Sequence, residues 1–179
     1  ETPEVEQSRM GIPLAFQDAS LERLDEMQRS GVEAIVSGSR PILTMVGTVG
    51  AGKTYAAVVA AREYKRRTGK HAHFYSFVDL LERYRASYDQ DRATETAAGI
   101  DAEIRRSGLI VLDDLGKQKS TEWAESQLFR LIDGRWKERR PLVVTTNVPP
   151  DQFDQAVRSR LFDSSAATVV VFDGKDRRR

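Results

Sequence analysis

One glycine-rich segment constrains the fold of this chain more than any other feature. Residues 47–54 read Gly-Thr-Val-Gly-Ala-Gly-Lys-Thr and fill every fixed position of the phosphate-binding pattern G-x-x-x-x-G-K-[ST]. An apolar run precedes the segment and a helix-compatible stretch follows it, so it joins a buried strand to a helix. Its glycines leave room for successive backbone N–H groups to turn toward phosphate oxygens. A glycine-rich turn without a ligand is the alternative, but such a turn does not require Lys-Thr after the last glycine.

Each position of this phosphate-binding loop has an expected role. Lys53 is expected to reach the outer phosphates of a nucleotide and to be partly exposed when the site is empty. The Thr54 hydroxyl is expected to ligate Mg²⁺. The predicted nucleotide-binding set is Gly47, Thr48, Val49, Gly50, Ala51, Gly52, Lys53 and Thr54.

The composition is that of a globular protein without thiol chemistry. The chain has 179 residues, 40% of them hydrophobic, and a net charge of +1, so any nucleic-acid surface must be local. Because it has no Cys, a disulfide framework, a thiolate metal site and a Cys nucleophile are excluded. No apolar run approaches a membrane span, and the first residues carry neither an initiator Met nor a signal-peptide core. We expect an excised fragment of a cytoplasmic protein with no membrane partner.

Apolar runs and helical stretches alternate along the chain. Ser20 is a candidate cap for a helix over residues 21–29, and residues 76–79 read as a capping box for a later helix. Strands separated by helices predict an α/β fold, a three-layer sandwich around a mostly parallel five-stranded sheet. We expect an N-terminal arm with a short helix over residues 1–38 and the main domain over 39–179. The predicted strands are residues 42–46, 73–77, 109–112, 142–145 and 168–172.

Acidic residues follow the third predicted strand. The run Leu-Ile-Val-Leu at residues 109–112 ends in Asp113 and Asp114, which is the Walker B pattern. Asp113 is expected to hold Mg²⁺ opposite Thr54, and Asp114 to orient or deprotonate an attacking water. The alternative is a strand that ends in an Asp-rich turn with Gly116 as its turn residue.

The fourth predicted strand ends in Thr145-Thr146-Asn147. Ligands of parallel sheets bind beyond the carboxyl ends of the strands, so Asn147 is a candidate for holding the attacking water or the γ-phosphate. Asn is equally a common turn residue ahead of Val-Pro-Pro, and both interpretations stay open.

Together these motifs resemble AAA+ ATPases of the DnaC/IstB type, which are bacterial helicase loaders and transposon helper ATPases. The resemblance covers nearly the whole chain and includes Arg135 and the Arg158–Leu161 segment in the expected order. It implies ATP and Mg²⁺ as ligands, self-assembly into a ring or spiral, and an arginine that a neighbouring subunit supplies. Two departures stand out. The catalytic carboxylate is Asp114 where Glu is usual, and the chain ends too soon for a full helical lid, so we expect slow turnover and a reduced or absent lid.

Two arginines lie close together after the fourth strand. Arg158 and Arg160 point about 200° apart on a helix, so only one of them can reach a given phosphate. The resemblance favours Arg160 as the catalytic arginine acting in trans. The alternative for both is a solvated helix charge.

A second candidate surface lies between the second and third strands. There Arg83, Tyr84, Arg85 and Tyr88 combine cations for phosphates with rings for stacking on bases, as in single-stranded DNA binding. The equal alternative is an amphipathic helix whose tyrosines pack on the core.

The favoured function is an ATPase that assembles with itself and loads a replicative helicase onto DNA. One alternative is an IstB-like transposase helper ATPase. Another is a nucleotide-gated binding module with little turnover.

Overall fold

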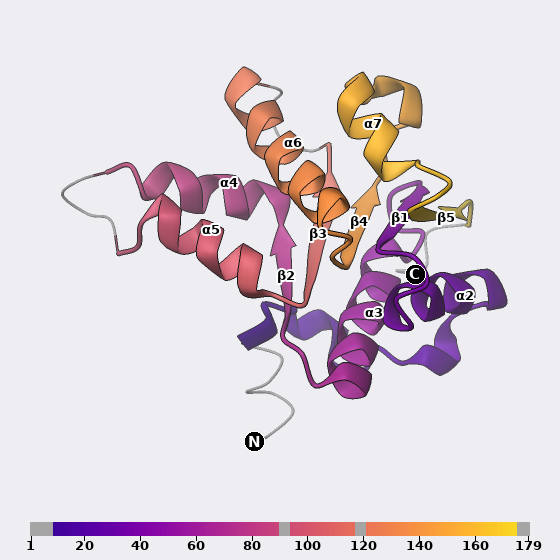
Figure 1. The fold of residues 1–179 in the computed structure, drawn as a ribbon. Coiled ribbons are helices and arrows are strands. Elements are labelled where there is room, and N and C mark those ends of the chain that lie inside the picture. Colours follow the sequence, from indigo (N-terminus) through magenta and orange to yellow (C-terminus); the bar gives the residue numbers. More distant parts are fainter. Residues whose placement is uncertain (1–8, 90–93, 117–120, 175–179) are drawn as a thin grey trace.

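The computed structural model describes residues 9–89, 94–116 and 121–174. Five parallel strands form one sheet in the order β2-β3-β4-β1-β5, so the strand before the phosphate-binding loop lies in the interior of the sheet (Figure 1). This confirms the α/β prediction, and the sheet is entirely parallel. The strands are β1 (Ile42–Gly47), β2 (Ala72–Ser76), β3 (Leu109–Leu115), β4 (Leu142–Thr146) and β5 (Ala167–Phe172).

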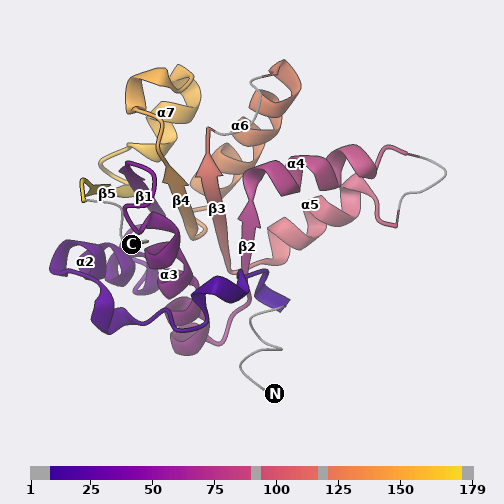
Figure 2. The same cartoon turned by 180° about the vertical axis from the view of Figure 1, so that it is seen from behind.

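Helices cover both faces of the sheet (Figure 2). One buried cluster joins α2 and α3 to alternate strand residues such as Leu109 and Val111. The other cluster joins the remaining helices to the intervening residues, such as Ile110 and Leu112. Because successive strand residues face opposite layers, near-continuous apolar strands are what this arrangement needs. The helices are α2 (Glu26–Val36), α3 (Lys53–Thr68), α4 (Phe77–Ala86), α5 (Ala97–Arg106), α6 (Glu122–Lys137) and α7 (Gln155–Leu161), with short 3-10 turns η1 (Leu14–Phe16), η2 (Leu21–Arg23) and η3 (Pro150–Gln152).

The predicted helix over residues 21–29 is wrong. Only Leu21–Arg23 form a turn, and α2 begins at Glu26 after Asp25. Gln28 N–H donates to Asp25 Oδ1 at 2.9 Å and Asp25 N–H donates to Gln28 Oε1 at 3.2 Å, a reciprocal capping box that Ser20 does not match. The capping box predicted at residues 76–79 is also wrong, although α4 does begin at Phe77, because Ser76 makes no side-chain cap hydrogen bond.

The N-terminal arm is tied to the core by its backbone. Gly11 has φ +72°, and a Cβ there would lie 2.5 Å from the carbonyl oxygen of Phe74, so this close crossing over β2 requires glycine. Arg62 of α3 donates to the carbonyls of Gln17 and Ala19 at 2.8 Å each. The arm therefore packs against the helix that follows the phosphate-binding loop. The division of the chain at residues 38 and 39 stays a prediction.

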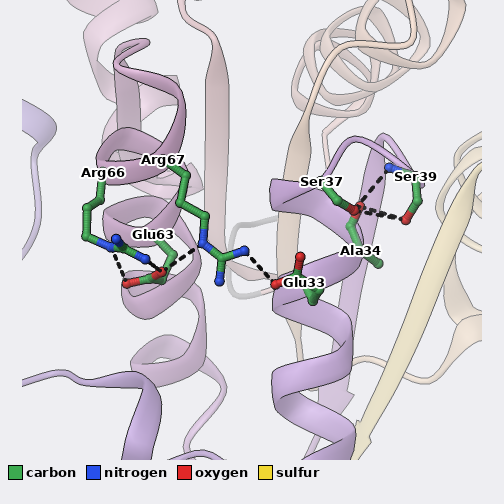
Figure 3. A network of polar contacts seen from close by, with 7 residues as sticks. All are labelled: Glu33, Ala34, Ser37, Ser39, Glu63, Arg66 and Arg67. Atoms are coloured by element: carbon green, nitrogen blue, oxygen red, sulfur yellow. Dashed lines mark hydrogen bonds and ion pairs between the residues drawn. The ribbon is translucent and has the colours of Figure 1, made fainter.

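An ion-pair chain links α2 to α3 (Figure 3). Arg67 donates to Glu63 on its own helix and to Glu33 on α2, with N–O distances of 3.2 and 2.6 Å. These side chains are partly exposed, so each pair contributes little, roughly 0–1 kcal/mol. The α2–α3 contact therefore depends mainly on the apolar residues beneath, such as Val32 and Ile35.

Candidate functional site

The phosphate-binding loop spans the gap between β1 and α3. Gly50 and Gly52 have φ of +79° and +99°, which residues with a Cβ rarely adopt. Gly52 is also the residue before the first turn of α3 and supplies no side-chain cap. The first N–H groups of this helix therefore point at the loop, where the positive end of the helix dipole favours an anion.

Lys53 is buried, with only 6% of its surface exposed, so the expectation of a partly exposed lysine is wrong. Its ammonium group donates to the carbonyls of Gly47 at 2.8 Å and Thr48 at 2.7 Å. These oxygens satisfy a charge that would otherwise be costly to bury. The loop thus holds its own cation in place.

Thr54 and Asp113 come together as predicted. The Thr54 hydroxyl lies 3.0 and 3.2 Å from the two carboxylate oxygens of Asp113, although the residues are 59 positions apart. Oxygen ligands from two elements next to a phosphate-binding loop are the donor set that Mg²⁺ prefers.

Thr145 belongs to the same network, and the sequence interpretation passed it over. Its hydroxyl donates to Asp113 Oδ1 at 2.6 Å and accepts from the N–H of Asp114 at 2.9 Å. Its position in the Thr-Thr-Asn element was the available signal. Thr145 fixes the orientation of the carboxylate that faces Thr54.

Asp114 lies at a break in the sheet. The pairing of β3 with β4 shifts register between Leu112 and Leu115, and Asp114 has φ +59°. A non-glycine residue in this region costs about 1–3 kcal/mol, and such strained residues cluster at functional sites. The bulge separates the two acids: Asp113 faces Thr54 and Thr145, whereas Asp114 lines a pocket beside the loop.

That pocket has a volume of about 460 Å³, within the range of small-molecule sites. Lys53, Thr54 and Asp114 form its polar side. The N-terminal arm forms the other side, which sequence reasoning did not predict. The residues outside the loop and the acid are Phe16, Arg23, Leu24, Gln28 and Tyr55.

Gln28 presents a defined group to this pocket. Its Oε1 accepts from Asp25 N–H, which fixes the orientation of the amide. The NH2 group of the same side-chain amide, with two N–H donors, is therefore the part left for a ligand. Tyr55 and Phe16 complete an aromatic wall with ring centroids 6.5 Å apart.

The remaining catalytic candidates lie apart from this network. Asn147 is exposed just beyond the end of β4. Arg160 donates to Asp133 at 3.2 Å and its guanidinium lies 4.6 Å from the centre of the Trp136 ring, so it rests against α6. Arg158 is exposed, and among the described residues no ion pair involves it. The structure thus distinguishes the two arginines, as the helix geometry predicted.

The four residues predicted to contact DNA, on and after α4, differ in exposure and in the contacts that their side chains already make. Arg83 pairs with Glu95 and Glu103 at 2.6 and 2.9 Å, and these hydrogen bonds raise the pKa of its guanidinium. Tyr84 is buried and donates to Asp101, so the packing alternative holds for it. Arg85 lies over the Trp123 ring at 5.0 Å, and Tyr88 is exposed.

Arg135 is buried, with 3% of its surface exposed. Its guanidinium donates to the carbonyls of Ser107 and Pro141 at 2.8 Å and of Gly108 at 3.0 Å. Burial lowers its pKa to about 10, so it stays charged at neutral pH. Arg135 is therefore a structural clamp between two loops, which precede β3 and β4.

Comparison with known proteins gives a family. The family described as IstB-like ATP binding protein matches residues 35–170, well over half of the chain. The DnaC helicase loader has the same fold, with a TM-score of 0.75 at 20% identity over 90% of this chain and 100% of that one. Among the described residues, no helix has the length and apolar character to cross a membrane.

Two curated proteins of Bacillus subtilis (strain 168) are similar to this chain over only part of their own length. The uncharacterized protein YqaM is 21% identical over 74% of this chain and 43% of its own. The phage-like element PBSX protein XkdC is 22% identical over 92% of this chain and 62% of its own. The matches thus span about two fifths to three fifths of the length of these relatives.

Proposed function

Because the chain belongs to the IstB-like ATP binding protein family, we propose that it binds and hydrolyses Mg·ATP in a self-assembled oligomer, as a helicase-loader ATPase. One observation carries the hydrolytic part of the proposal. The Thr54 hydroxyl and the Asp113 carboxylate converge beside a phosphate-binding loop, and Thr145 orients the carboxylate. The ligand ATP follows from the family, and Mg²⁺ from the chemistry of these oxygens.

Each residue of the site has a proposed part in the reaction. Thr54 and Asp113 would hold Mg²⁺, which neutralises phosphate charge. Asp114 would orient or deprotonate the attacking water, and Asn147 would hold that water or the γ-phosphate. Lys53 would transfer its hydrogen bonds from loop carbonyls to the outer phosphates. The apolar and aromatic arm residues would then face the base, with the Gln28 amide donating to its edge.

Arg160 is the proposed arginine that acts on a neighbouring subunit. Phosphoryl transfer gains a factor of roughly 10³ or more from such an arginine, because charge develops on the leaving phosphate. The Asp133 pair would be its resting position, since the side chain of Arg160 keeps 26% of its surface exposed there. Asp133 is buried, but Lys137 also pairs with it at 2.6 Å, so its carboxylate would keep a partner when Arg160 leaves.

The proposed partners are a replicative helicase and single-stranded DNA, and the proposed location is the cytoplasm. The fold shared with the DnaC helicase loader supports the first of these. A transposase client, as in an IstB-like helper, is the alternative. A nucleotide-gated module that binds ATP with little turnover is the other, because Asp114 is one methylene shorter than Glu.

Turnover across protein concentration tests the proposal. Specific ATPase activity should rise with concentration, since sites are completed in trans, and Arg160→Ala should bind ATP yet lose the rise. Arg158→Ala is the matched control and should be milder. A mixture of Arg160→Ala and Lys53→Ala proteins should regain activity, because one supplies the site and the other the arginine. Absence of this rescue in a mixture shown to co-assemble would rule out Arg160, and ATP binding without turnover at any concentration would favour the gated module.

A further inference from the structure

A second group of hydrogen-bond donors lies at the amino ends of β2, β3 and β4, the pole of the sheet opposite the phosphate-binding loop. It surrounds a pocket of about 500 Å³ that we call the amino-end basic pocket. A strand of five residues spans about 17 Å, so this pocket is separate from the nucleotide site. Its donor side chains are Tyr64, Lys70, His71, Arg106, Arg139 and Arg140.

The charge of this pocket has one sign. No carboxylate is among its lining residues in the part of the chain that the structure describes. Lys70, Arg106 and Arg139 are exposed, and the described residues show no ion pair for any of them. Arg140 has Glu138 at 3.7 Å, beyond hydrogen-bond distance. Since the whole chain carries only +1, this is a strong local concentration of positive charge.

A tyrosine hydroxyl adds a polar floor to the amino-end basic pocket. Tyr64 has 4% of its surface exposed, yet it lines the pocket, and its hydroxyl makes no hydrogen bond to another described residue. Gly108 makes room for it, because a Cβ there would lie 2.9 Å from that hydroxyl. Because this hydroxyl lies at the pocket surface, it can donate to an acceptor that enters the pocket.

The buried Arg135 side chain links two of the loops that carry these cations. Arg135 donates to Ser107 and Gly108, which follow Arg106, and to Pro141, which follows Arg140. Arg140 itself donates to the carbonyl of Ser107 at 3.2 Å. A pocket whose loops are already cross-linked loses less entropy when it binds a ligand.

The chemistry of the ligand follows from these groups. A lining of donors with no acid suits phosphate oxygens, and Arg suits them best. Neighbouring strands lie about 4.8 Å apart, so loops before three strands spread their charges over about 10 Å, more than one phosphate covers. We propose that the amino-end basic pocket binds the sugar–phosphate backbone of a nucleic acid. The proposal is independent of ATP turnover and of the candidate surface around α4.

Salt-dependent binding of a fluorescent oligonucleotide to the whole chain tests this, with single-stranded and duplex forms as separate arms. Arg106→Gln/Arg139→Gln should bind several-fold more weakly. It should also flatten the dependence of log K on log salt, by about 0.7 for each phosphate no longer neutralised on a single strand, or 0.9 on duplex. Arg66→Gln/Arg130→Gln removes the same charge from exposed helix positions and should keep most of the affinity and slope. Equal effects of the two double variants, or no binding by the parent protein at low salt, would overturn the proposal.

Two further measurements keep the result specific. Tyr64→Phe removes only the hydroxyl and should weaken binding about two- to tenfold; unchanged affinity would overturn its assignment to the ligand. Inorganic tripolyphosphate that binds the pocket while no oligonucleotide does would overturn the backbone assignment in favour of a small anion. Mg·ATP affinity should be unchanged in Arg106→Gln/Arg139→Gln, which separates this proposal from the ATPase proposal.

Discussion

The two poles of the sheet both gather cationic donors, but they balance them differently. At the carboxyl pole, the Lys53 ammonium lies on two loop carbonyls, and Asp113 accepts from two threonine hydroxyls. At the amino pole, the exposed charges of Lys70, Arg106 and Arg139 face a pocket with no acid among its described lining residues. The charged groups of the first pole are hydrogen-bonded within the protein, whereas the exposed cations of the second face solvent.

This difference sets how each pole should respond to its surroundings. Buried, mutually bonded groups are screened little by salt, so nucleotide binding at the carboxyl pole should depend on geometry. Exposed like charges are screened within about 8 Å at physiological salt, so binding at the amino pole should weaken steeply as salt rises. The buried Arg135 clamp is what holds those like charges close together.

The largest effect is expected from Asp114→Asn. The backbone bulge keeps Asp114 out of the Thr54–Asp113 contact, so its loss should spare Mg·ATP affinity. Turnover should fall by about 10²–10⁴-fold, the usual contribution of a general base. Phosphate release under single-turnover conditions measures this, with nucleotide titration as the control. Turnover at the parental rate would make the carboxylate structural.

Arg135→Met should give the next largest effect, on stability. It leaves the carbonyl of Gly108 without the Arg135 donor and removes one of the two donors to the carbonyl of Pro141, which keeps the N–H of Ile110. We expect a loss of about 2–4 kcal/mol in the free energy of unfolding. Thermal denaturation measures it. Arg130→Met is the matched control, since the Arg130–Asp101 pair is exposed and contributes about 1 kcal/mol or less. Equal losses in both variants would refute the clamp. In the surviving Arg135→Met protein, nucleic-acid binding should weaken more than ATP binding.

Gln28→Glu should have the smallest effect and tests the arm side of the nucleotide pocket. Glutamate keeps the acceptor of the capping box, but residue 28 is only 4% exposed, so its charge should lower stability. Thermal denaturation should still show a folded protein at the temperature of the binding assay. It replaces the amide donors with an oxygen, and ATP should bind about five- to tenfold more weakly. Inorganic tripolyphosphate lacks a base and feels only the added charge. Competition assays should therefore show a smaller loss for tripolyphosphate, and equal losses would exclude a contact between Gln28 and the base.

The contrast between the poles also explains what the sequence could predict. The phosphate-binding loop is contiguous in sequence, and Asp113 directly follows the apolar run at residues 109–112, so local sequence pattern identified both. The contact of Thr145 with Asp113, and the side of the nucleotide pocket that the N-terminal arm forms, involve residues that only tertiary packing brings together. The amino-end basic pocket is assembled from loops before three strands with no fixed spacing. Two predictions were wrong because a nearby group made the contact instead. Asp25 and Gln28 form the capping box in place of Ser20. The Lys53 ammonium is buried because it donates to carbonyls of its own loop. The catalytic role of Asn147 and the action of Arg160 on a neighbouring subunit stay predictions.

Calorimetric titration of Mg·ATP into the parent protein and Lys53→Ala tests the central claim most directly. The parent and the Arg106→Gln/Arg139→Gln variant should bind alike, because the latter changes only the amino pole. Lys53→Ala should bind about 10²-fold more weakly or not detectably, since it removes the one loop side chain that is charged, while its thermal denaturation shows that it is folded. Undiminished ATP binding by folded Lys53→Ala protein would contradict the assignment of the nucleotide site.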